Sequence, residues 1–253
     1  MAFVLDLQAA AERWSLTLGE PYEQGAAGYT VRAELADGTP AVLKLVHPHR
    51  ESEHEADALA TWKGDGAVRL LERDASGYVL LLERCEPGTP LSRLDADAAL
   101  DVLIGLLPRL WKPAEEPFHR LADEAAWWCE YLPRKWTGDR KLLDAALDAL
   151  RSLAPTQGEH VLLHQDLHAD NVLAAQREPW LAIDPKPLVG EREFAVAPIV
   201  RSFELGHSKR DVLHRFDRLT AELGLDRERA RGWTRSEERR VGKECRSRWS
   251  PYH

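Results

Sequence analysis

The sequence predicts an α+β protein in which an antiparallel sheet lobe comes before a mainly helical lobe. Apolar and polar residues alternate around Asp37-Gly38 between residues 28 and 46, a pattern typical of a β-hairpin. Breaker residues cluster at 86–88, and beyond them apolar residues recur at helical spacing. We therefore expect an N-terminal lobe over 1–85 and a C-terminal lobe over 86–234.

The expected first lobe contains two more strands and one inserted helix. Apolar residues at helical spacing predict that helix over residues 51–62, and glycines end it. Two short apolar segments, 68–74 and 77–84, predict the strands. At the start of the lobe, residues 1–14 mix apolar and charged side chains, which indicates an amphipathic helix rather than a signal peptide.

The expected second lobe begins its helices at residues that accept hydrogen bonds from free backbone N–H groups. Asp95, Asp139 and Ser208 each precede an apolar stripe at helical spacing, so each is a predicted N-cap. Gly224 is expected to end the third of these helices, and Asp226 to begin a last one.

Composition narrows the class of protein. The 34 basic and 42 acidic side chains give a formal net charge of −8, which disfavours nucleic-acid partners and favours a cationic ligand. No apolar run is long enough to cross a membrane, and three widely spaced cysteines fit neither a disulfide framework nor a zinc ribbon. These features predict a cytoplasmic protein with no membrane partner; they leave its oligomeric state unknown.

One stretch carries a dense set of reactive side chains. It runs through residues 161–175 and 180–187, where apolar strands alternate with polar loops. The side chains are His164, Asp166, His168, Asn171 and Asp184. Phosphoryl transfer from ATP needs a carboxylate at the attacking hydroxyl and oxygen ligands for magnesium. Asn171 follows Asp166 by five residues, and Asp184 follows a later strand, as in a kinase catalytic loop. A metallohydrolase-like His/Asp cluster and simple strand capping are the alternatives.

The sequence resembles the aminoglycoside phosphotransferase family, in its streptomycin 6-phosphotransferase and hydroxyurea phosphotransferase branch. The HxDxHxxN loop, the IDPKPLVG segment, VLKL around Lys44 and GDGAVRLLE from Gly64 carry this resemblance. It covers about residues 15–234 and implies a two-lobed protein-kinase-like fold that uses ATP and Mg²⁺. It also implies a small hydroxylated acceptor, cationic or rich in hydroxyl groups, such as streptomycin.

The resemblance assigns roles to individual residues. Asp166 would be the catalytic base, while Asn171 and Asp184 would hold Mg²⁺. Lys44 would contact the ATP phosphates, held by an acidic residue of the following helix. Glu55 is the preferred partner because Leu59 and Trp62 follow it on the same helix face; Glu51 and Glu53 are the alternatives.

Further nucleotide contacts are expected at both ends of the sheet lobe. Gly25 and Gly28 belong to a loop of small residues whose backbone N–H groups would approach the phosphates, although the loop lacks a full GxGxxG pattern. Glu83 and Cys85 end the last strand before the linker, and the backbone of that linker meets adenine in the fold that the resemblance implies.

The acceptor side is less defined by the sequence. Trp127, Trp128, Glu130 and Trp136 either wall an acceptor pocket or belong to the core. Asp170, Glu191 and Glu193 are candidates for attracting a guanidinium group, with solvated surface as the expected state of each. Besides antibiotic phosphorylation, a metabolic kinase for a sugar or choline and an inactive kinase-like protein remain open.

The last nineteen residues differ in composition from the rest. Residues 235–253 carry six basic and three acidic side chains, and back-translation of their sequence matches a widely used sequencing adapter. We interpret this segment as adapter-derived and non-native. The native C-terminal lobe is then expected to be cut at Thr234, and the remaining 28 basic and 39 acidic residues give a net charge of −11.

Overall fold

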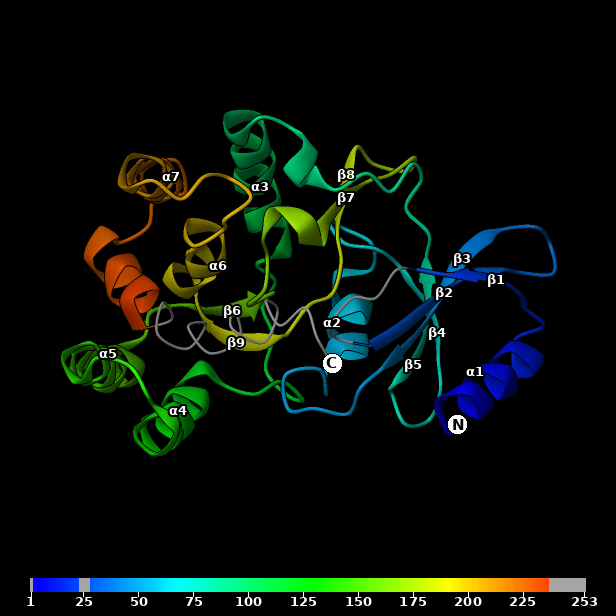
Figure 1. Ribbon diagram of the computed structural model, residues 1–253, viewed down its shortest axis with the longest axis horizontal. Helices are drawn as coiled ribbons and strands as arrows, with labels where there is room; N and C mark the ends of the chain where they lie inside the picture. Colours follow the sequence, from blue (N-terminus) through cyan, green and yellow to red (C-terminus); the bar gives the residue numbers. More distant parts are fainter. Residues whose placement is uncertain (1, 23–27, 237–253) are drawn as a thin grey trace. The chain divides into compact units, whose positions relative to one another are not determined.

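A computed structural model describes residues 2–22 and 28–236, which divide into two compact units (Figure 1). The first unit comprises the described residues up to Leu94 together with Asp170–Pro187. The second comprises Asp95–Ala169 and the described residues from Leu188 onward. Residues 170–187, expected from the sequence in the C-terminal lobe, thus pack with the first unit.

The first unit is built on a five-stranded antiparallel sheet in the order β1-β2-β3-β5-β4 (Figure 1). Its strands are β1 (Thr17–Pro21), β2 (Gly28–Glu34), β3 (Pro40–Val46), β4 (Leu70–Arg73) and β5 (Val79–Glu83). Its helices are α1 (Ala2–Arg13) and α2 (Glu55–Trp62), and a separate hairpin pairs β7 (Val172–Ala174) with β8 (Trp180–Ala182). The predicted α+β class, with an antiparallel sheet in this lobe, is confirmed.

The predicted hairpin joins β2 to β3. Gly38 adopts a φ of +85°, a conformation that glycine accepts without steric cost, and the amide of Thr39 donates to the Asp37 carboxylate at 2.9 Å. The hairpin places β3 at the centre of the sheet, between β2 and β5.

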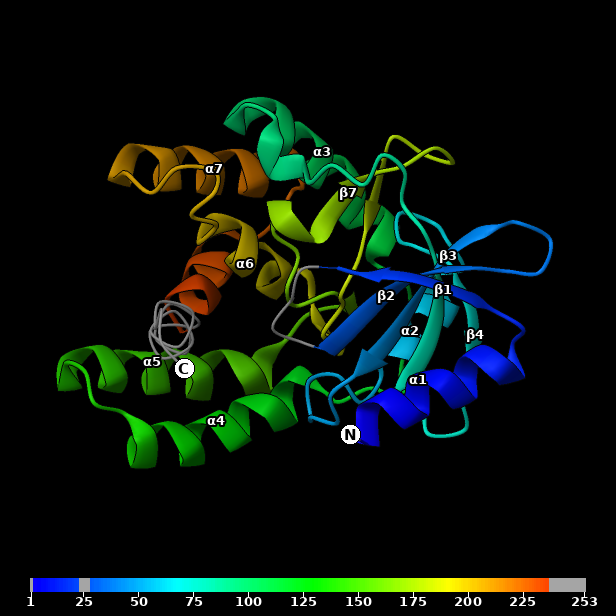
Figure 2. The same ribbon diagram turned by 45° about the vertical axis from the view of Figure 1, so that its right-hand side comes forward.

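The two faces of β3 have different roles. Leu43 and Leu45 belong to a buried apolar cluster that also contains Leu7 and Ala10 of α1, which lies along the sheet (Figure 2). Because successive side chains of a strand point to opposite faces, Lys44 between them faces away from α1. Lys44 therefore lies on the face of the sheet that carries α2.

Helix α2 begins four residues later than the sequence pattern predicts. Residues 51–54 form turns, and the Ser52 hydroxyl donates to the carbonyls of His47 at 2.9 Å and His49 at 3.0 Å. Serine competes well for backbone partners outside helices, so this turn replaces the first expected helical turn. Glu55 consequently becomes the first residue of the helix.

The second unit is mainly helical, as predicted. Its long helices are α3 (Ala96–Leu110), α4 (Leu121–Lys135), α5 (Arg140–Leu153) and α7 (Lys209–Glu222), with a short α6 (Ala197–Val200) and a final helix from residue 227 to at least 236. Strands β6 (His160–Leu163) and β9 (Leu188–Glu191) form a two-stranded sheet. Helices α4 and α5 pack side by side (Figure 2), and the Arg218–Asp101 ion pair, at 2.7 Å, joins α7 to α3.

The predicted helix caps are present. The side chains of Asp95 and Asp139 accept from the first-turn amides of α3 and α5, at 3.0 and 2.8 Å. Ser208 forms a reciprocal capping box with Asp211. The Asp226 carboxylate accepts from the amides of residues 228 and 229 at the start of the last helix.

Two predictions concern the chain ends and the membrane. The segment interpreted as adapter-derived, 235–253, lies outside the described residues from residue 237 onward. Among the helices of the described ranges, none is both long and apolar enough to span a membrane.

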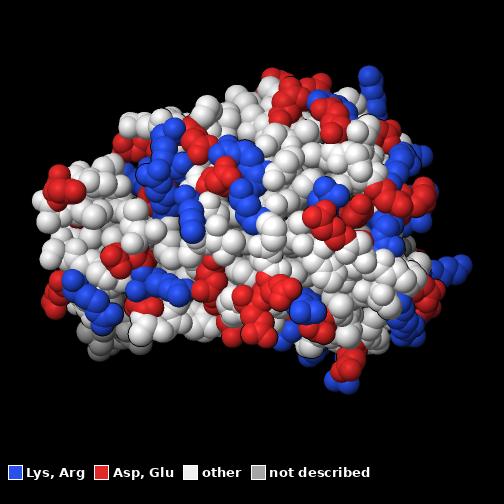
Figure 3. Space-filling model, turned by 180° about the vertical axis from the view of Figure 1, so that it is seen from behind, with Lys and Arg blue, Asp and Glu red and all other residues white. Residues whose placement is uncertain are grey.

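On the face of the molecule drawn in Figure 3, acidic and basic side chains are interspersed.

Candidate active site

The first unit brings together three of the predicted site residues. Lys44 Nζ lies 2.6 Å from Glu55 Oε1 and 2.7 Å from Asp184 Oδ1. Lys44 and Glu55 are each 3% exposed, whereas the Asp184 side chain is 36% exposed. A buried lysine is thus held between a helix carboxylate and a carboxylate that reaches solvent.

This arrangement keeps Lys44 charged. Burial alone lowers the pKa of its ammonium group, but the charges of Glu55 and Asp184 outweigh burial and raise the pKa above its usual value. A permanently charged ammonium group at the sheet face can bind an anionic ligand such as a phosphate group.

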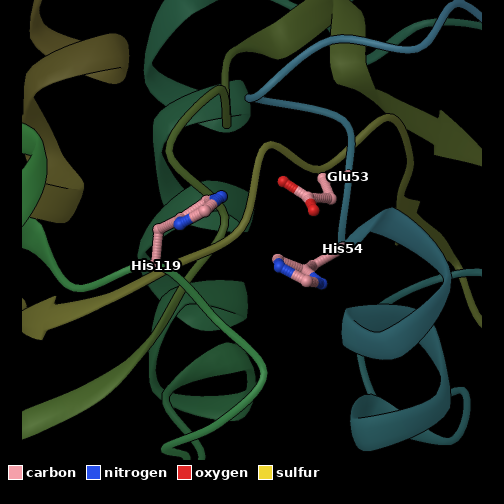
Figure 4. A group of neighbouring side chains, drawn as sticks. All are labelled: Glu53, His54 and His119. Carbon is pink, nitrogen blue, oxygen red and sulfur yellow. The ribbon is translucent and has the colours of Figure 1, made fainter.

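The alternative partners of Lys44 lie elsewhere. Glu51 Oε2 is 3.9 Å from Lys186 Nζ. Glu53 lies beside His54 in the segment that leads into α2, as Figure 4 shows; His119, also drawn there, belongs to the second unit. Glu55 is therefore the residue that holds Lys44.

Asn171 and Asp184 flank the β7–β8 hairpin at its open end. The amide of Ile183 donates to the carbonyl of Asn171 at 2.9 Å, which ties the two ends of the hairpin together. Asp184 has a φ of +54°, in the left-handed region that non-glycine residues seldom occupy. Such backbone conformations concentrate at functional sites, where the surrounding structure enforces them.

Asp166 belongs to the second unit and follows β6. Its amide donates to the carbonyl of His164 at 2.8 Å across a tight turn, in which Gln165 has a φ of +59°. His164 is buried, and Asp166 is half-buried. The predicted base therefore lies in a tight turn that follows β6 rather than in the strand itself.

His168 is held by a residue that the sequence analysis did not identify. Its Nδ1 lies 2.7 Å from Glu204 Oε1. Burial opposes ionisation of Glu204, but the hydrogen bond and charge of His168, helped by Ser202, hold the pKa of this carboxyl at about 2. Glu204 thus stays ionised and fixes the imidazole of the HxDxHxxN loop.

Arg215 of α7 organises the segment around Glu204. This arginine is 2% exposed and donates to the carbonyls of four residues: Val200, Ser202, Leu205 and Gly206, at 2.6 to 3.1 Å. The sequence analysis identified neither Glu204 nor Arg215, since the partners of these two residues are 9 to 36 positions distant.

The glycine-rich segment is only partly described. Gly25 lies outside the described residues. Gly28 begins β2, where an added Cβ would stand 2.3 Å from the carbonyl oxygen of Leu45. Close packing of β2 on β3 therefore explains this glycine without reference to a ligand.

Glu83, at the end of β5, and Cys85, two residues later, differ in chemistry. Both carboxylate oxygens of Glu83 are bonded, to the Arg177 guanidinium and to the amide of Arg69. Burial, together with the charge of Glu83, raises the pKa of Cys85 to about 12, so its thiol is protonated and unreactive at neutral pH.

The acceptor-side candidates separate into different environments. Trp128 is buried against Phe194, while Trp127 is exposed and stacks on Tyr131 with ring centroids 4.6 Å apart. The expectation that Glu191 is solvated is wrong, because its side chain is 1% exposed and bonded to Arg229.

Comparison with known proteins identifies the class and the family. The fold resembles the ternary complex of a thermostable mutant of aminoglycoside phosphotransferase APH(4)-Ia with ADP and hygromycin B, with a TM-score of 0.62, 13% identity and coverage of 96% of this chain and 94% of that one. Residues 13–239 match the family described as aminoglycoside/hydroxyurea antibiotic resistance kinase.

Two curated relatives are much closer in sequence. A hydroxyurea phosphotransferase of Kitasatospora aureofaciens is 46% identical over 88% of this chain and 67% of its own length. A streptomycin 6-kinase of Streptomyces glaucescens is 43% identical over 88% of this chain and 76% of its own length. The protein is thus a phosphotransferase with a protein-kinase-like fold. It belongs to the aminoglycoside/hydroxyurea antibiotic resistance kinase family.

Proposed function

We propose that this phosphotransferase moves the γ-phosphate of ATP to a hydroxyl group of an aminoglycoside such as streptomycin. The contact of buried Lys44 with both Glu55 and Asp184 carries the nucleotide part of the proposal, because it presents a fixed positive charge beside a carboxylate. The relatives named for streptomycin and hydroxyurea support the acceptor class.

The donor set of the hairpin fits magnesium. Asp184 and Asn171 offer carboxylate and amide oxygens, the ligand types that Mg²⁺ prefers beside phosphate oxygens. The Asp184 side chain is partly exposed while it touches Lys44, so solvent reaches the carboxylate. In this role Mg²⁺ neutralises charge on the phosphates.

The protein residues then perform separate tasks. Lys44 binds the ATP phosphates, and Glu55 holds its side chain. Asp166 accepts the proton of the acceptor hydroxyl while the acceptor oxygen bonds to the γ-phosphorus and the bond to the β-phosphate oxygen breaks. ADP leaves as the second product. His168, fixed by Glu204, orients the loop that carries Asp166.

Hydroxyurea is the second candidate acceptor. The relative named for it has higher identity, 46% against 43%, than the streptomycin kinase cited above. Both acceptors present a hydroxyl group as the nucleophile, so the same base serves either one.

Phosphate transfer to a panel of acceptors tests this function. The purified chain is incubated with MgATP and streptomycin, hydroxyurea or choline, and phosphorus NMR follows the new phosphate ester together with ADP. We expect an ester on streptomycin or hydroxyurea. Phosphorylation of choline alone would instead support a metabolic kinase, and an intact ATP signal with every acceptor would support an inactive protein.

A further inference from the structure

Arg177 lies in the turn of the β7–β8 hairpin, at the end opposite Asn171 and Asp184. Its Nε lies 2.8 Å from Glu83 Oε1, and its Nη2 lies 2.9 Å from Glu83 Oε2. The two side chains are 21% and 17% exposed. A two-point bond between a guanidinium and a carboxylate fixes both distance and orientation, which a lysine cannot do.

The same guanidinium also fixes the loop that follows α2. Nη1 donates to the carbonyl of Gly64 at 2.8 Å, and Nη2 donates to the carbonyl of Ala67 at 3.1 Å. Gly64 has a φ of +84°, and a Cβ there would stand 2.8 Å from Arg69 Cγ and 3.3 Å from Arg177 Nη2. The positive φ and the close approach of the Arg69 and Arg177 side chains together favour glycine at the first position of the GDGAVRLLE motif.

That loop in turn pairs with β8. The amide of Ala182 donates to the carbonyl of Gly66 at 2.9 Å, and the amide of Val68 donates to the carbonyl of Ala182 at 3.0 Å. Ala182 stands two residues before Asp184. Arg177 thus fixes the loop of residues 64–68, and this loop pairs with β8, the strand that leads to Asp184. Through Glu83, Arg177 also joins the hairpin to the end of β5.

We propose that Arg177 is a positioning residue that sets the magnesium-dependent affinity of the protein for nucleotide. It does so by holding the β7–β8 hairpin at two places, through Glu83 and through residues 64–68. The inference rests on the proposed roles of Asn171 and Asp184 as magnesium ligands. Loss of the Arg177 bonds lets the hairpin shift, which separates Asp184 from Lys44.

Calorimetric titration with ADP, in Mg²⁺ and in EDTA, tests the proposal without any acceptor. Arg177→Gln is expected to lower the affinity for ADP in Mg²⁺ about tenfold, within the range seen when residues that support metal ligands are removed. The affinity in EDTA is expected to change less than about twofold, because the metal ligands do not contribute there. A general loss of folding would lower the bound fraction in both conditions alike.

Three further variants complete the experiment. Arg177→Lys keeps the charge without the fork and is expected to restore part of the loss. Glu83→Gln removes the charge of the partner while keeping its size, and it provides the test if Arg177→Gln does not fold. Arg140→Gln removes an exposed ion pair with Asp144 and serves as the control with unchanged binding.

The outcomes separate this inference from the proposed function. Wild-type affinity in Mg²⁺ for both Arg177→Gln and Glu83→Gln, or equal losses in Mg²⁺ and EDTA, would overturn the positioning role. Failure of the wild type to phosphorylate any acceptor would refute the proposed acceptor chemistry but leave a magnesium-specific loss as support for the positioning role. If the wild type binds ADP equally well in Mg²⁺ and in EDTA, both the positioning role of Arg177 and the proposed magnesium site are overturned.

Discussion

Replacing Lys44 with methionine is expected to destabilise the first unit in a pH-dependent way. Lys44 Nζ is 2.6 Å from Glu55, and both residues are 3% exposed, so Lys44→Met leaves a buried carboxyl without its cation. Burial already raises the pKa of Glu55, and removal of the Lys44 charge, which lowers that pKa, raises it further and favours the protonated carboxyl. The charge of Asp184 acts in the same direction.

The largest loss of stability expected for Lys44→Met is the cost of protonating Glu55 when the chain folds. At about 1.4 kcal/mol per pH unit, a carboxyl with a usual pKa of 4.5 that takes up a proton on folding at pH 7 costs at most about 3.5 kcal/mol. At pH 5 the same cost is about 1 kcal/mol, because the unfolded chain binds the proton too. When the pKa of an acid is higher in the folded than in the unfolded state, the protein is destabilised at pH values above the unfolded pKa. Well below that pKa both states bind the proton, and stability is unaffected. Lys44→Met is therefore closer to wild type at pH 5 than at pH 7.

Urea unfolding measures this prediction, with hydrogen exchange followed in peptides of β3 and α2. The double variant Lys44→Met/Glu55→Leu removes both charges and is expected to recover most of the lost stability while remaining inactive. Glu53→Gln, which changes an exposed acid of the preceding turn, is the control. Equal destabilisation of Lys44→Met at pH 5 and pH 7, or a double variant as unstable as Lys44→Met, would refute the reasoning.

Two other predictions concern the second unit. Glu191→Gln removes the charge that accepts from Arg229 Nη2 at 2.8 Å and from the amide of Gly158 at 3.0 Å, and it is expected to cost about 2 kcal/mol in urea unfolding. A loss below about 0.5 kcal/mol, typical of exposed sites, would show that the pair does not stabilise the fold. Glu204 has a folded pKa of about 2 against a usual 4.5, so its contribution is fully present above pH 4.5 and disappears as the pH falls towards 2. When the pH is lowered from 5 to 3, the free energy of unfolding is thus expected to fall less for Glu204→Gln than for wild type. Urea midpoints that fall equally in the two proteins would contradict the lowered pKa of Glu204.

Local sequence patterns predicted the elements that position the site. The hairpin at Asp37-Gly38 and the caps at Asp95, Asp139 and Ser208 depend on residues only a few positions apart, and all are present. The structure starts α2 four residues later than the prediction, because the hydrogen bonds of Ser52 with the carbonyls of His47 and His49 hold residues 51–54 in turns. The spacing of apolar residues does not indicate where a polar side chain such as that of Ser52 bonds to the backbone.

Local sequence patterns did not predict the charge pairs between residues that are far apart in the sequence. Glu83 and Arg177 are 94 residues apart, and His168 and Glu204 are 36 apart, so their contact depends on how the chain folds back. Glu191 lies in a charged segment that predicts solvent exposure, yet Arg229 compensates its charge in the interior. A single sequence contains the members of such pairs but does not indicate which residues meet.

Phosphate transfer by Asp166→Asn tests the central claim most directly. The substitution keeps the size and hydrogen-bonding shape of the side chain but removes the group that accepts the proton. Transfer from ATP to streptomycin or hydroxyurea is expected to fall by at least about a hundredfold, the lower range for a general base. The affinity for MgADP is expected to stay within about twofold, since Lys44, Asn171 and Asp184 are unchanged. An Asp166→Asn protein that transfers phosphate at the wild-type rate would contradict the account.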